Sequence, residues 1–141
     1  MKITVRDYCS SDYIELISLL NKVYGSKTDQ KTLEEKYLTS ERRIHVAVTE
    51  DNDLVGCIFT EIQEDYIRPS RIIYVTYVVV NEDYRQCGIG RKMFEYVEDM
   101  CCKKHCSAIE FTSADFRIGA HIFYDKLGYT KKKTTHFIKE I

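Results

Sequence analysis

The sequence lacks most of the features that would set it apart from ordinary globular domains. It contains no tryptophan and one proline, Pro69, and its 21 Lys and Arg residues are balanced by 22 Asp and Glu residues. So little proline argues against a disordered or collagen-like chain, and balanced charge provides no broad basic field for nucleic acid or an anionic membrane. We therefore predict no nucleic-acid partner, and we expect any anion-binding site to be local.

Long apolar segments are also missing. No run approaches the roughly 20 residues that cross a membrane, and the first residues lack the apolar core of a signal peptide. The prediction is a protein without a membrane partner that stays in the cytoplasm. The six cysteines are accordingly expected to be reduced thiols, since disulfides are typical of secreted chains.

Length and periodicity predict one α/β domain with α+β features. The chain has 141 residues, which suffice for one hydrophobic core, so we predict a single domain over residues 1–141. The expected strands are residues 2–7, 44–49, 54–64, 72–80, 108–112 and 136–138, and the expected helices are residues 13–24, 30–39, 88–104 and 119–127.

Two of these segments have unusual patterns. Residues 72–80, IIYVTYVVV, are apolar at nearly every position, which predicts a central strand covered on both faces. The helix at residues 30–39 has a weak apolar stripe, and a mobile helix there would form a lid.

A segment with two glycines follows the apolar strand. Arg85-Gln86-Cys87-Gly88-Ile89-Gly90-Arg91 leads from that strand into an amphipathic helix. Glycine lets the main chain approach a ligand closely, and the first N–H groups of a helix lack internal partners and attract anions. This predicts a phosphate cradle to which Arg85 and Arg91 add charge. The alternative is a turn that only joins strand to helix.

The motif Arg-x-x-Gly-x-Gly after VVVNEDY, together with AHIFYDKLGY at residues 120–129, resembles the two landmarks of the GNAT acetyltransferase superfamily. Their order and spacing match, so the resemblance covers the whole chain. It implies a mixed, mostly antiparallel sheet of about six to seven strands with about four helices, and a splayed V between the two central strands. It also implies an enzyme that transfers acetyl from acetyl-CoA, its cosubstrate, to the primary amine of a small molecule.

The resemblance further implies how the cosubstrate is held. The main chain of Val78, Val79 and Val80 would pair with the pantetheine arm as an added strand does, and Gln86 through Cys87, Gly88, Ile89 and Gly90 to Arg91 would hold the pyrophosphate. The three valines can be plain core residues at the same time. Arg117 stands where relatives often have an asparagine that binds pantetheine, and it is expected to bind a phosphate or an acidic group of the substrate. The alternative for Arg117 is a solvated helix start.

Tyr124 aligns with the tyrosine that this family places near the CoA sulfur. Its phenol is expected to act as general acid toward the departing thiolate, although a ring packed in the core explains the residue equally. Many relatives have a glutamate as general base on the central strand, where this chain has Tyr74 and Tyr77. By their location, Glu61, Glu110 and His121 are alternative candidates for the general base. Water is a further candidate.

Cys101, Cys102, His105 and Cys106 have the residue types of a metal site. Helical spacing pairs Cys101 with His105 and Cys102 with Cys106, but the two pairs face different directions. Because a structural zinc needs four converging ligands, we predict no metal.

The acceptor stays open at this point. Arg117, Ala120-His121 and Phe123-Tyr124 are similar to a branch that includes aminoalkylphosphonate N-acetyltransferases, which favours a small amine with an anionic group. The alternatives are an enzyme acting on a protein lysine or N-terminus, an aminoglycoside acetyltransferase, and a CoA-binding sensor without activity. The family resemblance is also compatible with a homodimer.

Overall fold

The computed structural model describes residues 1–67 and 69–141. These residues form two compact units, Met1–Phe111 and Thr112–Ile141. The first unit contains the sheet and three α-helices, and the second contains one α-helix.

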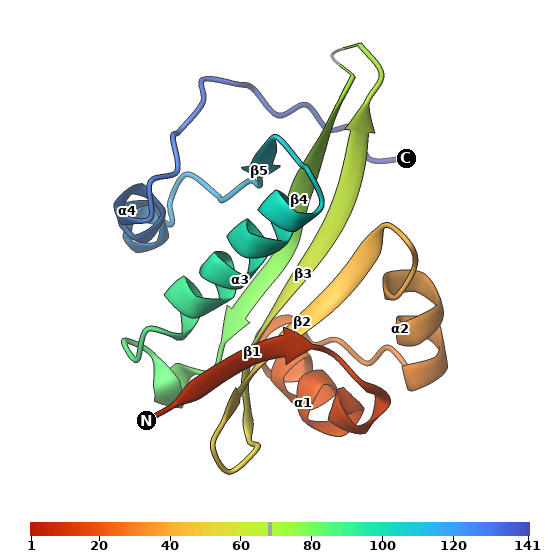
Figure 1. The fold of residues 1–141 in the computed structure, drawn as a ribbon, viewed down its shortest axis with the longest axis vertical. Helices are drawn as coiled ribbons and strands as arrows, with labels where there is room; N and C mark the ends of the chain where they lie inside the picture. Colours follow the sequence, from red (N-terminus) through yellow and green to blue (C-terminus); the bar gives the residue numbers. More distant parts are fainter. Residues whose placement is uncertain (68) are drawn as a thin grey trace. The chain divides into compact units, whose positions relative to one another are not determined.

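The sheet of the first unit has five strands, in the spatial order β1, β2, β3, β4, β5 (Figure 1). They are β1 (Ile3–Asp7), β2 (Arg42–Thr49), β3 (Leu54–Asp65), β4 (Ser70–Val80) and β5 (Ala108–Glu110). The first four are antiparallel to their neighbours, and β5 is parallel to β4. The predicted mixed, mostly antiparallel sheet is confirmed, with five strands instead of six to seven.

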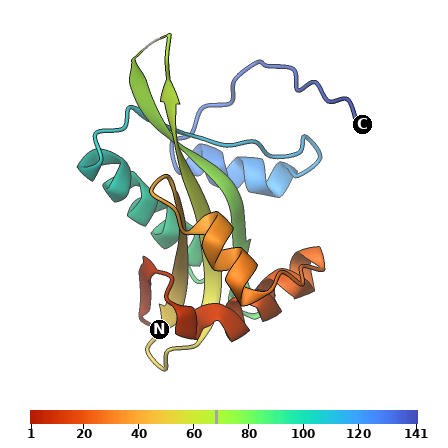
Figure 2. The same cartoon turned by 90° about the vertical axis from the view of Figure 1, so that its right-hand side faces the viewer.

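Helices cover both faces of this sheet. Figure 2 shows α1 (Tyr13–Tyr24) and α2 (Gln30–Tyr37) on one face and α3 (Ile89–Lys103) on the other. Leu16, Leu20 and Leu33 are buried against the first face, together with Ile44 and Phe59 of the strands. Burial of these side chains favours folding by about 1.5–3 kcal/mol each before the entropy cost of ordering them.

α2 is held to the rest of the unit by several side chains. Ser10 Oγ donates to Glu34 at 2.6 Å, and Gln30 donates to the carbonyl of Ser10 at 3.1 Å. Leu33, on α2 itself, is buried in the hydrophobic core. The structure therefore shows a docked helix where a weak apolar stripe suggested a lid.

β4 differs from the prediction of a strand covered on both faces. Ile73, Val75 and Val79 are buried, whereas Thr76 and Tyr77 in the middle of the strand are exposed. The sequence pattern did not reveal that Thr76 and Tyr77 are exposed, because tyrosine and threonine have high strand propensity whether they are covered or not.

The second unit consists of α4 (Ile118–Lys126) and the segment that follows it. Gly128 has a φ of 93°, as expected for a glycine just after a helix. The strand predicted at residues 136–138 is absent from the described structure, where residues 129–141 have neither helix nor strand. A strand exists only where its main chain pairs with another, and the exposed Phe137 and Ile138 show that side-chain type alone did not decide the outcome.

None of the described helices combines the length and the apolar composition that a membrane span requires. All six cysteines are free thiols.

Candidate functional site

The C-terminal half of β4 has a strand partner on only one edge. β5 pairs with Ile72, Ile73 and Tyr74 and then ends, whereas β3 follows β4 as far as Val80. Phe59 lies opposite Tyr77 and Thr60 opposite Val75, so Thr76 is an extra residue that forms a β-bulge. Among the described residues, no strand pairs with the second edge of residues 75–80. The pairing of β4 with β5 thus ends at Tyr74 and Glu110.

Main-chain groups of Val78 and Val80 point toward this unpaired edge. The N–H of Asn81 donates to the carbonyl of Val55 at 2.8 Å, and hydrogen-bonded pairs alternate along an antiparallel ladder. Val79 therefore faces β3, where its N–H reaches the buried thiol of Cys57. Of the three valines, Val78 and Val80 present N–H and C=O groups to the unpaired edge, and Val79 is a core residue.

The chain then turns through left-handed backbone before α3 begins. Gln86 has a φ of 61° and Gly88 a φ of 77°. Gly88 is the N-cap residue of α3, without a side-chain cap, and the first helical hydrogen bond runs from the Lys92 N–H to the Gly88 carbonyl at 3.1 Å. The N–H groups of residues 89–91 thus precede the helical ladder, and the helix dipole adds partial positive charge. This is the geometry of an anion site at a helix start.

A second glycine brings α3 close to the sheet. A Cβ at Gly56 would lie 3.1 Å from the carbonyl oxygen of Val79 and 3.2 Å from Cγ2 of Ile89. Gly56 therefore lets the first turn of α3 pack directly beside the end of β4. Sequence reasoning missed this residue, whose one signal is a glycine inside a strand, typical of close approach.

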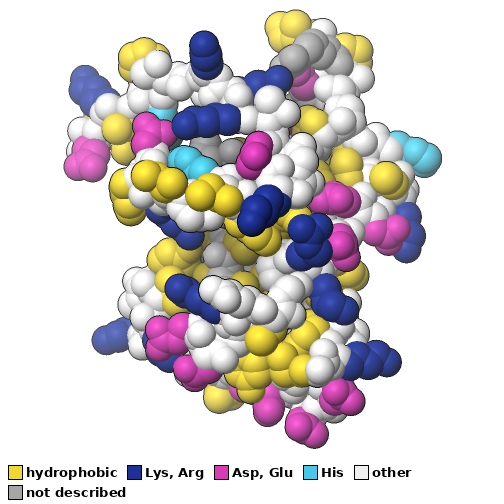
Figure 3. All heavy atoms as spheres, turned by 90° about the vertical axis from the view of Figure 1, so that its left-hand side faces the viewer, with side chains coloured by type: hydrophobic (Ala, Val, Ile, Leu, Met, Phe, Trp, Pro, Cys, Tyr) yellow, Lys and Arg dark blue, Asp and Glu magenta, His cyan; other side chains and the backbone are white. Residues whose placement is uncertain are grey.

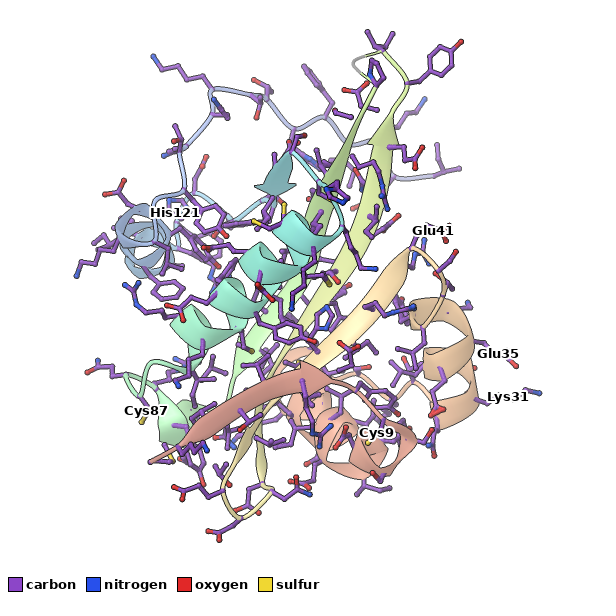
Figure 4. All side chains as sticks on the ribbon, in the orientation of Figure 1. Cys9, Lys31, Glu35, Glu41, Cys87 and His121 are labelled. Atoms are coloured by element: carbon purple, nitrogen blue, oxygen red, sulfur yellow. The ribbon has the colours of Figure 1, made fainter. Side chains whose placement is uncertain are left out.

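The charges near the loop are local. Arg85 and Arg91 are exposed at its two ends, and Cys87 is exposed between them, before the start of α3 (Figure 4). On the face shown in Figure 3, basic and acidic side chains are interspersed, so no field of one sign extends across it. The structure thus brings all the predicted residues from Arg85 to Arg91 together in one loop and helix start.

A hollow of about 400 Å³ opens next to the bulge of β4. It lies on the sheet face that α1 and α2 cover, and we call it the aromatic hollow. Its lining residues are Tyr37, Arg42, Arg43, Phe59, Thr60, Glu61, Tyr74, Thr76 and Tyr77. Tyr74 and Tyr77 therefore both line this hollow.

The rings around this hollow touch edge to face. The ring centroids of Tyr24 and Tyr77 are 5.4 Å apart, those of Tyr77 and Phe59 are 5.6 Å apart, and those of Phe59 and Tyr37 are 5.8 Å apart. Sequence reasoning placed Tyr24 and Tyr37 within predicted helices but assigned them no role at a site. Only the packing of α1 and α2 on the sheet brings them together with Tyr77.

Glu61 is the one carboxylate that lines the aromatic hollow. It lies opposite Arg42 on β2 and opposite Tyr74 on β4, and its Oε2 is 3.7 Å from Nε of Arg42. Glu110, another candidate base, lies opposite Tyr74 on β5 and lines a second hollow with Glu64 and Asp65. The two glutamates therefore belong to different hollows.

Three predicted residues belong to the second unit. Arg117 is the N-cap residue of α4, without a side-chain cap, and His121 and Tyr124 lie on the helix itself (Figure 4 labels His121). Burial raises the pKa of the Tyr124 phenol above its usual value of 10.0, and the positive charge of Arg117 opposes this. The phenol is therefore protonated at neutral pH and can donate a hydrogen bond.

The cysteines at the end of α3 do not form the helical pairs that their spacing suggested. The helix ends at Lys103, and His105 has a left-handed φ of 55°, so His105 and Cys106 lie beyond it. The thiol of Cys101 donates to the carbonyl of Cys106 at 3.4 Å. Within residues 1–67 and 69–141, no group of three or more His, Cys, Asp or Glu residues is arranged to hold a metal ion.

Comparison with known proteins places this geometry in a family context. The model of the acetyltransferase (GNAT) family matches residues 12–129. A probable N-acetyltransferase 14 from Xenopus tropicalis is 29% identical over 76 residues, which are 54% of this chain and 35% of that protein. The match therefore spans about a third of that relative's length.

Solved structures share the fold over nearly the whole chain. An aminoglycoside acetyltransferase from an uncultured soil metagenomic sample has a TM-score of 0.87 at 20% identity, covering 99% of this chain and 96% of its own. A glucosamine-6-phosphate N-acetyltransferase from Arabidopsis thaliana has a TM-score of 0.84 at 18% identity, covering 99% of both chains. At these identities the likeness shows the fold alone.

Proposed function

This chain belongs to the acetyltransferase (GNAT) family, and we propose that it is an enzyme that transfers acetyl from acetyl-CoA to the primary amine of a small molecule. The observation that supports the proposal best is one continuous run of main chain. An unpaired edge at Val78 and Val80 leads directly into the uncapped start of α3. We propose that residues 1–141 act as one acetyltransferase domain in the cytoplasm, as a monomer or a homodimer.

The residues at the end of β4 fit CoA chemically. Main-chain N–H groups from Gln86 to Arg91 would hold the pyrophosphate, with Arg85 and Arg91 adding full charges. No side chain fills the space at Gly88, since a Cβ there would meet no atom within 4 Å. The amide groups of pantetheine would pair with Val78 and Val80 as an added strand does. Bound in this way, acetyl-CoA supplies the activated thioester carbonyl.

Transfer would take place by direct attack of the amine in a ternary complex. The nitrogen attacks the thioester carbonyl carbon, and a main-chain N–H of Val78 or Val80 stabilises the negative charge that develops on the carbonyl oxygen. The C–S bond then breaks as Tyr124 donates its proton to the departing sulfur, and the nitrogen releases its extra proton, which returns the Tyr124 phenolate to the phenol. Arg117 is assigned to a phosphate or an acidic group of the bound molecules.

The amine must lose a proton before it attacks. Of the three candidate bases, Glu61 lines the aromatic hollow beside Tyr74 and Tyr77. We therefore favour Glu61, directly or through water, over Glu110 and His121. An aminoglycoside acceptor is the second candidate, and the carboxylates of Glu64, Asp65 and Glu110 in the second hollow favour it.

A thiol-release assay with acetyl-CoA tests the proposal. The panel contains arylalkylamines, aminoalkylphosphonates, polyamines, amino acids, aminoglycosides and a lysine peptide. Stoichiometric release of CoA with one small-amine class is the expected result. Release with the lysine peptide alone would transfer the proposal to a protein acceptor, and CoA binding without release would indicate a CoA sensor.

A further inference from the structure

The aromatic hollow has a composition that selects among amines. Its wall is continuous, because the rings of Tyr37, Phe59 and Tyr77 follow one another at centroid distances of 5.8 and 5.6 Å, and Tyr24 extends the row by 5.4 Å. Tyr74, which lies opposite Glu61 on the neighbouring strand, also lines the hollow. Aromatic faces attract cations and bury hydrocarbon, whereas they offer nothing to a phosphonate or a carboxylate.

The charge in the hollow allows for one ammonium group. Glu61 is part-exposed, and its single described ion pair joins Oε2 to Nε of Arg42 at 3.7 Å, longer than a good hydrogen bond. Arg42 also donates from Nη1 to the carbonyl of Lys36 at 3.2 Å. Its guanidinium is therefore shared with α2, and none of the described hydrogen bonds uses Oε1 of Glu61.

The second arginine of the lining is directed elsewhere. Arg43 donates to the carbonyls of Thr39 and Arg42, and its charge acts on Asp7 and His45 at the α3 face of the sheet. Because Ile44 is in the core beneath α1 and α2, its neighbour Arg43 points to the opposite face. Both arginine side chains of the lining thus have partners in the described structure: Arg42 contacts Glu61 and α2, and Arg43 donates to main-chain carbonyls.

From these contacts we propose that the acceptor is a small monoamine with an aromatic or aliphatic hydrocarbon body. The body packs on the rings of Phe59, Tyr77 and Tyr37, and the ammonium group pairs with Glu61. This inference rests on the proposed function and specifies its substrate class. A volume of about 400 Å³ is near the lower end of ligand pockets, roughly 300–1,000 Å³, which suits a molecule of this size.

The inference replaces the expectation of an amine with an anionic group, which rested on Arg117 and its neighbours in the sequence. It also differs from a polycationic acceptor, which would need several carboxylates around its ammonium groups. Those carboxylates lie in the second hollow, with Glu64, Asp65 and Glu110.

Three amines separate these possibilities. Thiol release from acetyl-CoA is measured for 2-phenylethylamine, for 2-aminoethylphosphonate, which shares its two-carbon amine, and for spermidine. We expect kcat/KM to be at least about tenfold higher for 2-phenylethylamine, because the phosphonate cannot use the rings and spermidine brings uncompensated charge. A preference for 2-aminoethylphosphonate or for spermidine overturns the inference and leaves the proposed function standing.

Variants then test the two parts of the hollow. Glu61→Gln is expected to raise KM for 2-phenylethylamine about tenfold through loss of a charge-assisted contact, and also to lower kcat because the proposed base is lost. Tyr77→Leu is expected to raise that KM about fivefold through loss of an aromatic face on which the body packs. Glu35→Gln removes the same charge from the outer side of α2 (Figure 4), and Tyr66→Leu removes a ring exposed at the tip of the β3–β4 hairpin. Both controls are expected to keep the wild-type KM.

The outcomes are distinguishable. An unchanged KM in both Glu61→Gln and Tyr77→Leu, with wild-type unfolding temperatures, overturns the inference. No thiol release with any amine overturns both the inference and the proposed function. The substrate preference of the wild-type enzyme decides the question even where a variant folds poorly.

Discussion

Two parts of one strand, β4, contribute to the proposed site in opposite ways. At its C-terminal end, Val78, Val80 and the following loop present main-chain groups, and the side chains of these two valines are half-buried. In its middle, at the bulge, Tyr74 and Tyr77 present side chains to a hollow. A main-chain site depends on backbone geometry and requires few particular residues, whereas a side-chain site can change its ligand by substitution. We infer that the first part keeps the cosubstrate and the second sets the acceptor.

The largest expected effect tests the side chain proposed as general acid. Tyr124→Phe removes the proton donor, and general acids typically contribute about 100-fold or more to kcat. We expect kcat to fall about 100-fold with little change in the dissociation constant for CoA, measured by calorimetry. An unchanged kcat would remove Tyr124 from the mechanism.

The next prediction concerns the backbone conformation of the proposed pyrophosphate site at the start of α3. Gly88→Ala places a Cβ on a residue with a φ of 77°, which costs about 1–2 kcal/mol or shifts the backbone. We expect the KM for acetyl-CoA to rise about tenfold, because the N–H groups of residues 89–91 would no longer point toward the bound pyrophosphate.

Gly25→Ala is the matched control for this change. Gly25 has a φ of 68°, also with no atom near an added Cβ, and it ends α1, outside residues 85–91. It should lower the unfolding temperature as Gly88→Ala does and leave the KM for acetyl-CoA unchanged. Equal effects of the two variants on that KM would refute a special role for Gly88.

A smaller effect is expected from the charges beside the loop. In the double variant Arg85→Gln and Arg91→Gln, the main-chain cradle stays and two exposed cations are lost. We expect about a fivefold rise in the KM for acetyl-CoA that diminishes at high ionic strength. Lys31→Gln, on the outer side of α2, is the control and should have no effect. A loss as large as that of Gly88→Ala would mean that side chains, not main chain, dominate the binding of phosphate.

The smallest effect concerns the sheet that both parts share. His45 is fully buried between β2 and α3, with Nδ1 2.8 Å from Asp7 Oδ1 and Nε2 2.9 Å from Thr60 Oγ1. Burial lowers the pKa of His45 below 6.5, although the hydrogen bond to Asp7 opposes this. The neutral ring therefore donates to Asp7 and accepts from Thr60.

Because the folded pKa of His45 is depressed, the unfolded chain binds a proton first as the pH falls. Stability is then present above about pH 6.5 and is lost below it. Burial by itself raises the pKa of Asp7, but hydrogen bonds from His45 and Tyr96 lower it by more, so the pKa lies below 3.8. Protonation of Asp7 therefore does not contribute to the change in stability between pH 7 and pH 5. We expect the unfolding temperature to fall by a few degrees between pH 7 and pH 5. A His45→Gln variant should show a weaker dependence in that interval, and an identical dependence would exclude His45 as its cause.

Much of the scaffold could be predicted from the sequence. The strands before and after the turn at residues 50–53, the crossover through α3 and the ends of α1 at Gly25 all follow from local periodicity and turn residues. The loop from Arg85 to Arg91 was also predictable, because glycines after a buried strand and before an amphipathic helix have a local signature.

The acceptor side was less predictable, for physical reasons that particular residues illustrate. Tyr24, Tyr37 and Phe59 lie on three different elements, and only tertiary packing brings them together around Tyr77. The exposure of Thr76 and Tyr77 depends on a bulge that leaves no mark in a run of strand-forming residues. The strand expected at residues 136–138 depended on a pairing partner, which the segment's own sequence does not supply.

We infer that the C-terminal end of β4 binds the cosubstrate and that its middle binds the acceptor. The most direct test is a crystal structure of the protein with CoA. The account predicts pyrophosphate oxygens within hydrogen-bond distance of main-chain N–H groups between Gln86 and Arg91, and pantetheine amides paired with Val78 and Val80. Pantetheine paired elsewhere, or phosphates held only by arginine side chains, would contradict it.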